Sequence, residues 1–164
     1  MLDNRHLHRL TKQLDVISSF LALGDEQISK VQHDISSWSA AEQLDHALKV
    51  DGSIFHRLLE DPEPGALPPI NLLGRVILAL GWIPRGRAPS PKALRGEPAK
   101  CTALSAAAGA VRSQLDNLTQ ERLNRSAPLV PHPRFRGLTT LEALRFAGIH
   151  TEHHLKIVRE ILAR

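Results

Sequence analysis

The stretch TTLEALRFAGIHTEHHLKIVREIL, residues Thr139 to Leu162, predicts a long amphipathic helix that begins at a capping box. Thr139 and Glu142 have the T-x-x-E spacing in which each side chain bonds the backbone amide of the other residue. The stretch also contains His150 and His154. Side chains four residues apart lie on the same face of a helix, so this pair can present two imidazoles to one metal ion.

A helical wheel separates the adjacent histidines of this stretch. With about 100° per residue and His150 at zero, the apolar residues of the helix point between about 20° and 140°. His154 falls at about 40°, inside that arc, and His150 lies at its edge, whereas His153 falls at about 300°. We therefore expect His150 and His154 to border the interior and His153 to face solvent.

Two histidines do not usually complete a metal site, so a third ligand must come from another part of the chain. The candidates are His33, His46, His56 and His132. His46 belongs to a predicted helix, although the wheel places it off the main apolar stripe of that helix. Spacing alone favours His46 and leaves the other three open.

The rest of the chain predicts helices separated by irregular connections. Apolar residues recur at three- and four-residue steps, and Ser39 with Glu42 forms a second capping box. The helices are expected over residues 2–23, 39–60, 70–80, 98–123 and 139–162. Two connections rich in Pro and Arg precede the last two helices, and no strand is expected. The predicted fold class is all-α, a four-helix bundle with long crossover loops.

Length and composition predict one soluble domain over residues 1–164. The net charge is only +4, and aromatic residues, which could stack on bases, make up only 4% of the chain. Both values argue against specific nucleic-acid binding. The apolar run from Ile70 to Ile83 is too short to span a bilayer and predicts a buried helix. Because the start of the chain lacks a signal-peptide pattern and Cys101 is the single cysteine, we expect a cytoplasmic protein without a membrane partner.

Two further side chains have alternative interpretations. Cys101 is expected in the first turn of its helix, a position that can lower the pKa of a thiol, but we favour an inert, partly buried cysteine. Asp51 lies on an apolar helix face, where a carboxylate needs a partner. We favour an ion pair with an arginine such as Arg75 or Arg112; the alternative is that Asp51 orients a ligand histidine.

Three segments together resemble the DinB/YfiT-like superfamily. They are WSAAEQLDH from Trp38 to His46, PHPRFRG from Pro131 to Gly137, and HTEHHL from His150 to Leu155. The resemblance covers essentially the whole chain. The chain departs from the pattern at Arg136-Gly137, where close relatives often carry Gly first, so the exact turn of this loop is open.

The resemblance implies an up-down-down-up bundle, often dimeric, with a metal site formed by His46, His150 and His154. Closed structural zinc sites generally use four protein ligands, so three imidazoles would leave a position open for catalysis. Imidazoles suit several divalent metals, of which we expect zinc or nickel. Members with known activity include thiol S-transferases and a thiol-dependent isomerase, whereas the branch that this chain most resembles has no assigned activity.

The sequence therefore predicts a metal-dependent hydrolase or thiol S-transferase that acts on a small molecule, with a low-molecular-weight thiol as a candidate cofactor. The alternative is a bundle that binds a metal or a partner without catalysis. In either case we expect a homodimer. A DNA-associated protein is a third and disfavoured hypothesis. Arg85, Arg87 and Arg134 are candidates for binding an anionic substrate, and Asp51 and Glu152 are weak candidates for a general base.

Overall fold

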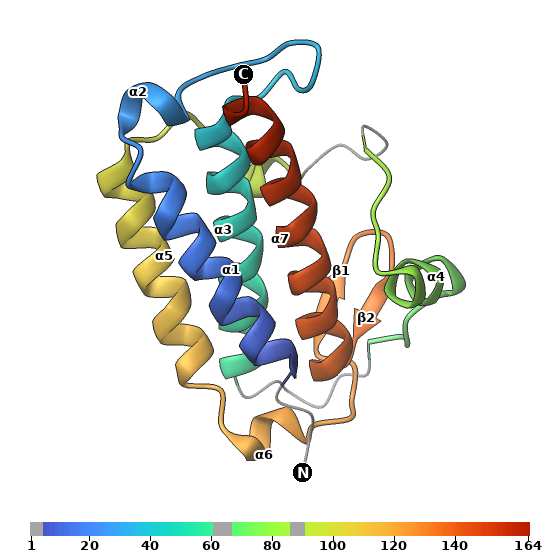
Figure 1. Cartoon of the computed structure of the whole chain (residues 1–164). Coiled ribbons are helices and arrows are strands. Elements are labelled where there is room, and N and C mark those ends of the chain that lie inside the picture. The colour runs from blue at the N-terminus through green and yellow to red at the C-terminus, as the bar shows by residue number, and fades with distance from the viewer. Residues whose placement is uncertain (1–4, 61–66, 86–90) are drawn as a thin grey trace.

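The chain folds into a four-helix bundle in a computed structural model that describes residues 5–60, 67–85 and 91–164 (Figure 1). The bundle helices are α1 (Arg5–Leu21), α3 (Ala40–Leu59), α5 (Cys101–Asp116) and α7 (Thr140–Leu162). Both α1 and α3 pack against α5 and α7, so the four helices enclose one core. Because α1 and α7 run in one direction and α3 and α5 in the other, the predicted up-down-down-up order is confirmed.

Each bundle helix buries an apolar stripe. Leu10, Leu14 and Ile17 follow one another at four- and three-residue steps along α1 and are at most 2% exposed. The corresponding residues of α7, such as Leu144 and Leu155, are also buried. Fully burying one such side chain stabilises the fold by roughly 1.5–3 kcal/mol relative to leaving it in water.

Both helices that carry the candidate metal ligands begin at the predicted capping boxes. The Ser39 hydroxyl accepts a hydrogen bond from the Glu42 amide at 3.2 Å, and the Glu42 carboxylate accepts one from the Ser39 amide at 2.8 Å. Thr139 and Glu142 form the same pair of bonds at 3.3 and 2.9 Å. The two boxes satisfy amides that the helices leave unbonded and so define where α3 and α7 begin.

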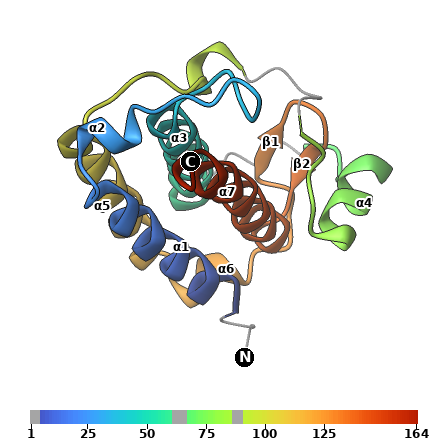
Figure 2. The same cartoon turned by 45° about the horizontal axis from the view of Figure 1, so that its top comes forward.

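The connection between α3 and α5 runs the length of the bundle because these two helices point the same way (Figure 1). The shorter elements of the fold are α2 (Asp25–Ile28), α4 (Leu72–Leu80), η1 (Lys92–Leu94), α6 (Gln120–Leu123), β1 (Val130–His132) and β2 (Arg136–Leu138). Within the connection, α4 contacts α7 and lies outside the ring of four helices (Figure 2).

The prediction that α4 is a buried helix is wrong. Leu72 is 77% exposed and Leu80 is 66% exposed, whereas Gly74, Ile77 and Leu78 are the buried residues of this helix. One face of α4 packs on the protein, and no other described element covers the opposite face.

Residues 130–138 form an antiparallel hairpin, which the sequence did not predict. Val130 lies opposite Leu138 and His132 opposite Arg136. Strands of three residues are too short to show an alternating pattern, so the composition of this segment indicates only a loop. The hairpin meets the start of α4, where the Asn71 amide donates to the Phe135 carbonyl at 3.1 Å.

The other helix boundaries differ in detail from the prediction. The helix expected over 98–123 is two helices, since α5 ends at Asp116 and α6 begins after Thr119. The Thr119 hydroxyl accepts from the Arg122 amide and starts the new turn. Residues 2–4 of the first predicted helix lie outside the described residues. None of the helices in the described ranges is both long and apolar enough to cross a membrane.

Arg136 provides a test of backbone strain. Its φ of 70° lies in the left-handed region, where a Cβ atom is unfavourable, and it occupies a position where the DinB/YfiT-like pattern often has Gly. Arg136→Gly is expected to raise the free energy of unfolding by about 0.5–1 kcal/mol, because relief of the strain exceeds the added entropy of the unfolded chain. Chemical denaturation measures this change. Arg136→Ala keeps the Cβ atom, and an equal gain in that control would contradict the explanation.

Candidate metal centre

His46 on α3 and His150 and His154 on α7 lie together where these helices pack. A nitrogen of each ring lies within 4.8 Å of a nitrogen of the other two. The Nε2 atoms of His150 and His154 are 3.2 Å apart. Two nitrogens bound at 2.0–2.1 Å to a tetrahedral ion are separated by about 3.3 Å, so this pair already has the spacing of two ligands. The three side chains fit a divalent ion, and their role as ligands stays a prediction.

Hydrogen bonds set the tautomers of two of these imidazoles. The Nδ1 atom of His46 lies 2.5 Å from the Leu94 carbonyl oxygen, and that of His154 lies 2.5 Å from the Gln43 side-chain oxygen. Because these oxygens only accept, both Nδ1 atoms carry the proton, and both Nε2 atoms keep a lone pair for an ion. The side-chain nitrogen of Gln43 donates to the Ser36 hydroxyl at 2.9 Å, and its side-chain oxygen is turned toward His154.

His150 has no comparable partner. Its Nδ1 atom is buried and has no hydrogen-bond partner among the described residues. Its proton can lie on Nε2 and point to the lone pair of His154, or on Nδ1, which frees Nε2 for an ion. The hydrogen bonds around the site therefore fix the tautomers of His46 and His154 but not that of His150.

Burial keeps the three imidazoles neutral. Loss of contact with water lowers the pKa of His46, and it lowers the pKa values of His150 and His154 well below the ordinary value of 6.5. Repulsion from neighbouring imidazoles lowers the last two pKa values further. Metal ions bind the neutral form, so at neutral pH the ligands need not first lose a proton.

Aromatic side chains border the histidines on two sides. The ring of Trp38 lies 5.3 Å from that of His46, and the ring of Phe146 lies 5.5 Å from that of His150. Apolar walls limit the access of water and strengthen electrostatic interactions inside a site.

The end of the long connection holds the Leu94 carbonyl against α3. The Glu97 amide donates to the Asp45 carboxylate at 2.9 Å. Between these two points, Gly96 passes so close to α3 that a Cβ atom there would lie 2.1 Å from the Glu42 carbonyl oxygen. Only glycine fits this approach, and the approach keeps the Leu94 carbonyl beside His46.

The sequence did not identify Leu94 and Gln43 as the groups that orient the histidines. Gln43 had a detectable signal, because it lies three residues before His46 on the same helix face. Leu94 had none, since a backbone carbonyl acts here and any residue type carries one.

The three alternatives to His46 lie elsewhere. His33 and His56 are exposed on the surface. His132 belongs to the hairpin, where its Nδ1 atom accepts from the amides of Arg134 and Phe135 at 3.2 and 3.1 Å. Burial, reinforced by the Arg134 charge, lowers the pKa of His132 to about 4.

His153 lies outside the group of three histidines, although its ring is 5.1 Å from that of His154, and it does not face open solvent as the wheel predicted. Its side chain is half-buried, and a hydrogen bond with the backbone of Ile83 links it to the long connection. Burial lowers its pKa. The wheel describes only the bundle, so it could not show that a crossover covers this face of α7.

Asp51 is 1% exposed and accepts a hydrogen bond from the Thr151 hydroxyl at 2.7 Å. The predicted ion pair with Arg112 is wrong, because Arg112 pairs with Asp15 at 2.5 Å. Arg75 is exposed on α4 and does not form the ion pair with the buried Asp51 either. Burial without a compensating charge raises the pKa of Asp51 to about 7.

Glu152, the other candidate base, lies on the side of α7 that faces α1. Its carboxylate pairs with Arg159 at 2.8 Å and accepts a hydrogen bond from the side-chain nitrogen of Gln13 at 3.4 Å. The structure therefore brings neither Asp51 nor Glu152 into hydrogen-bond contact with the three histidines in the described part of the chain.

The predicted substrate-binding arginines are dispersed. Arg85 forms two bonds to the Glu160 carboxylate at 2.7 and 2.6 Å, so its charge is already compensated. Arg134 is exposed on the hairpin. Arg87 lies outside the described residues.

Cys101 is partly buried, as the favoured interpretation has it, and the alternative of a thiol activated by the helix N-terminus is wrong. Burial raises its pKa, and the nearby Asp25 carboxylate raises it further. The same carboxylate accepts a hydrogen bond from the Cys101 amide at 2.6 Å. A thiol with a raised pKa forms little thiolate at neutral pH and is unreactive.

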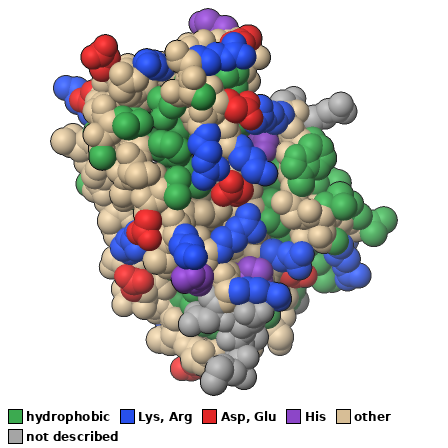
Figure 3. All heavy atoms as spheres, viewed as in Figure 1, with side chains coloured by type: hydrophobic (Ala, Val, Ile, Leu, Met, Phe, Trp, Pro, Cys, Tyr) green, Lys and Arg blue, Asp and Glu red, His purple; other side chains and the backbone are tan. Residues whose placement is uncertain are grey.

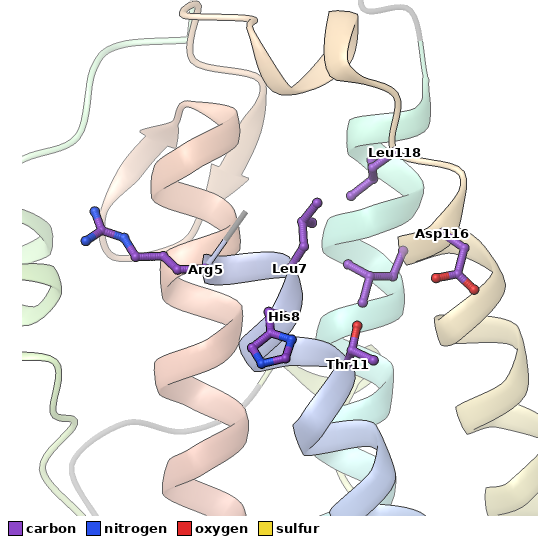
Figure 4. A pocket seen from close by; sticks show the side chains of 7 residues that line it. Arg5, Leu7, His8, Thr11, Asp116 and Leu118 are labelled. Atoms are coloured by element: carbon purple, nitrogen blue, oxygen red, sulfur yellow. The ribbon is translucent and has the colours of Figure 1, made fainter. Parts of the chain in front are cut away.

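Two hollows on the described surface lie along α1 and away from the histidines. One is bordered by Leu7, His8 and Thr11 of α1 and by Asp116 and Leu118 near the end of α5 (Figure 4). The other is bordered by further residues of α1 and by Glu152. Neither borders a candidate ligand.

Residues 9–158 match the family model of the DinB superfamily. The chain belongs to the DinB superfamily. The match includes all three histidines of the candidate site and extends from α1 into α7. No curated protein and no solved structure matches the chain. For this DinB-superfamily chain, the comparisons thus support the fold and leave the reaction to be inferred from the site.

The contribution of Gln43 can be tested with a buried control. Gln43→Leu is expected to weaken metal binding about 10- to 100-fold, because His154 loses the acceptor that orients it. Competition with a chromophoric chelator measures the affinity. Gln13→Leu is the matched control, since Gln13 is also buried but bonds to the Gly148 carbonyl on another side of α7. Equal weakening in both variants would contradict a specific role for Gln43.

Asp51→Asn tests the buried carboxylate. The pKa of Asp51 is raised, so the folded state retains a proton that the unfolded state releases, and the contribution of Asp51 to stability falls as pH rises from about 4 to about 7. Asn does not titrate. The difference in unfolding free energy between Asp51→Asn and the wild type should therefore increase by about 2–3 kcal/mol, in favour of the variant, from about pH 5 to about pH 8. Urea denaturation of metal-free protein measures it, and a difference independent of pH would contradict the raised pKa.

Proposed function

We propose that this chain binds one divalent metal ion, zinc or nickel, through His46, His150 and His154, and that it transfers a low-molecular-weight thiol to a small electrophile. The observation that supports the ligand set is the convergence of three neutral imidazoles, two of them oriented by carbonyl oxygens. Three protein ligands leave one position open, as in catalytic rather than structural zinc sites.

The ion would supply a Lewis acid that lowers the pKa of a thiol or a water molecule at that open position. The surrounding side chains favour a thiol over water. Hydrolysis usually relies on a general base that removes a proton from the attacking water. Asp51 and Glu152, the carboxylates considered for this role, bond to other groups instead.

A thiol has a single proton to lose before it reacts, and this proton would pass to the solvent. The thiolate sulfur would then attack the electrophilic carbon, an S–C bond would form, and the leaving group would depart with the electron pair of the broken bond. Cys101 is unsuited to supply this sulfur because burial raises its pKa. The thiol would therefore be a free co-substrate. His46 and His154 would hold its binding position, and Trp38 and Phe146 would limit water there.

A non-catalytic metal-binding bundle is the second candidate. It is favoured by the bonding of Asp51 and Glu152 to other groups, which leaves neither candidate base in hydrogen-bond contact with the three histidines. Metal binding is common to both candidates, so metal content tests the ligand set and turnover separates the two functions.

Metal analysis of protein purified without a nickel column is expected to find one ion per chain. His46→Ala and His154→Ala should each lose it, because two imidazoles hold a divalent ion much more weakly than three. His153→Ala removes the adjacent imidazole, which lies outside the group of three, and should keep the ion. Unchanged metal content in His46→Ala and His154→Ala would refute the ligand set.

Turnover is expected when the metal-loaded protein is mixed with a small thiol and 1-chloro-2,4-dinitrobenzene, with release of chloride and loss of the free thiol. The rate should fall to background in His154→Ala. Hydrolysis of an ester without thiol would instead support a hydrolase. Bound metal without turnover across a panel of thiols, electrophiles and esters would support the non-catalytic bundle.

A further inference from the structure

One surface is formed by exposed apolar side chains of α4 and of the turn after it. We name it the α4 surface, and it consists of Leu72, Leu73, Val76, Leu80 and Trp82. These are five of the eight large hydrophobic side chains that are exposed in the described part of the chain. Figure 3 shows hydrophobic side chains gathered at the edge of the molecule occupied by α4. Contiguous apolar patches of this kind mark interaction sites more often than chance exposure does.

The α4 surface is directed outward by tight packing on its other side. A Cβ atom at Gly74 would lie 2.6 Å from the Ile70 side chain and 2.9 Å from that of Phe135. The Asn71 side chain caps α4 by accepting from the Gly74 amide at 2.9 Å, and it donates to the Arg134 carbonyl at 2.7 Å. The helix is thus seated on the hairpin, and turning its apolar face inward would break these contacts.

Exposed arginines flank the α4 surface. Arg75 on α4 and Arg134 and Arg136 on the hairpin are exposed. Arg85 differs, since Glu160 from α7 compensates its charge.

We propose that the α4 surface binds to the surface of a membrane that contains anionic lipids. Exposed leucines on one helix face, with Trp82 directly after the helix and arginines beside it, form the pattern of helices that lie in the membrane interface. Each nearby arginine adds attraction to anionic headgroups. With nine residues, α4 lies on the bilayer and does not cross it. The proposal is independent of the metal centre and replaces the expectation that no membrane is among the partners.

Charge distinguishes this occupant from a second copy of the chain. A two-fold contact through the α4 surface would use the same patch on both copies. It would therefore bring the exposed Arg75, Arg134 and Arg136 of one copy toward the same exposed arginines of the other. An anionic lipid surface supplies the opposite charge along with an apolar layer for the leucines.

Vesicle binding tests the proposal. The full chain is mixed with vesicles of phosphatidylcholine alone or with one-quarter phosphatidylglycerol, and binding is measured by sedimentation. Binding is expected only to the anionic vesicles and should weaken as salt rises. Trp82 is 56% exposed, so its fluorescence should shift to shorter wavelength on binding, and Trp82→Phe should remove this shift.

Substitutions separate the apolar and charged contributions. Leu72→Ser with Leu80→Ser, and separately Arg75→Glu with Arg134→Glu, should each weaken binding at least about tenfold. Leu23→Ser is the control, because Leu23 is 52% exposed beside α2, away from the α4 surface. These positions are exposed, so circular dichroism and metal content should remain those of the wild type.

Three results would overturn the proposal. The first is the absence of binding to either kind of vesicle. The second is an equal loss of binding in the Leu23→Ser control. The third is a dimer in sedimentation equilibrium that Leu72→Ser with Leu80→Ser dissociates, which would assign the α4 surface to a second copy of the chain.

Discussion

The packing of α3 against α7 is the contact on which the rest of the structure depends. It is the most extensive contact between two elements of the fold, and small residues such as Ala47 and Ala147 are fully buried in the bundle. Short side chains allow helices to approach closely. The same contact contains the bond between Asp51 and Thr151, and it brings His46 within reach of the histidine pair of α7. The candidate metal centre is thus a consequence of how these two helices meet.

Helical topology explains the second part of the site. Because α3 and α5 are parallel, the chain between them must run the length of the bundle. Two parts of this connection have separate structural roles. Its end holds the Leu94 carbonyl against His46, with Gly96 allowing the close approach. Its middle places α4 outside the bundle, with an apolar face exposed beside several arginines. A segment that composition describes only as an irregular crossover therefore orients a candidate ligand and also carries most of the exposed large hydrophobic side chains among the described residues.

Much of the fold and part of the site could be predicted from sequence, for reasons that differ between residues. The capping boxes at Ser39 and Thr139 are local, so the starts of α3 and α7 were predicted correctly. The pair His150 and His154 follows from helical periodicity, and the structure brings both to α3. His46 does not follow from spacing, since its position depends on how two helices pack, and the family resemblance was needed to select it. The Leu94 carbonyl, the hairpin and the exposed face of α4 depend on tertiary contacts that no local pattern encodes.

The central claim is that His46, His150 and His154 bind one metal ion through their Nε2 atoms. The most direct test is a crystal structure of the metal-loaded protein, with the ion located by anomalous scattering. We expect one ion with the three Nε2 atoms at about 2.0–2.3 Å and with no further protein ligand, together with the Nδ1 bonds of His46 to Leu94 and of His154 to Gln43. An ion bound at other residues, or no ion in this group of histidines at saturating metal, would contradict the account.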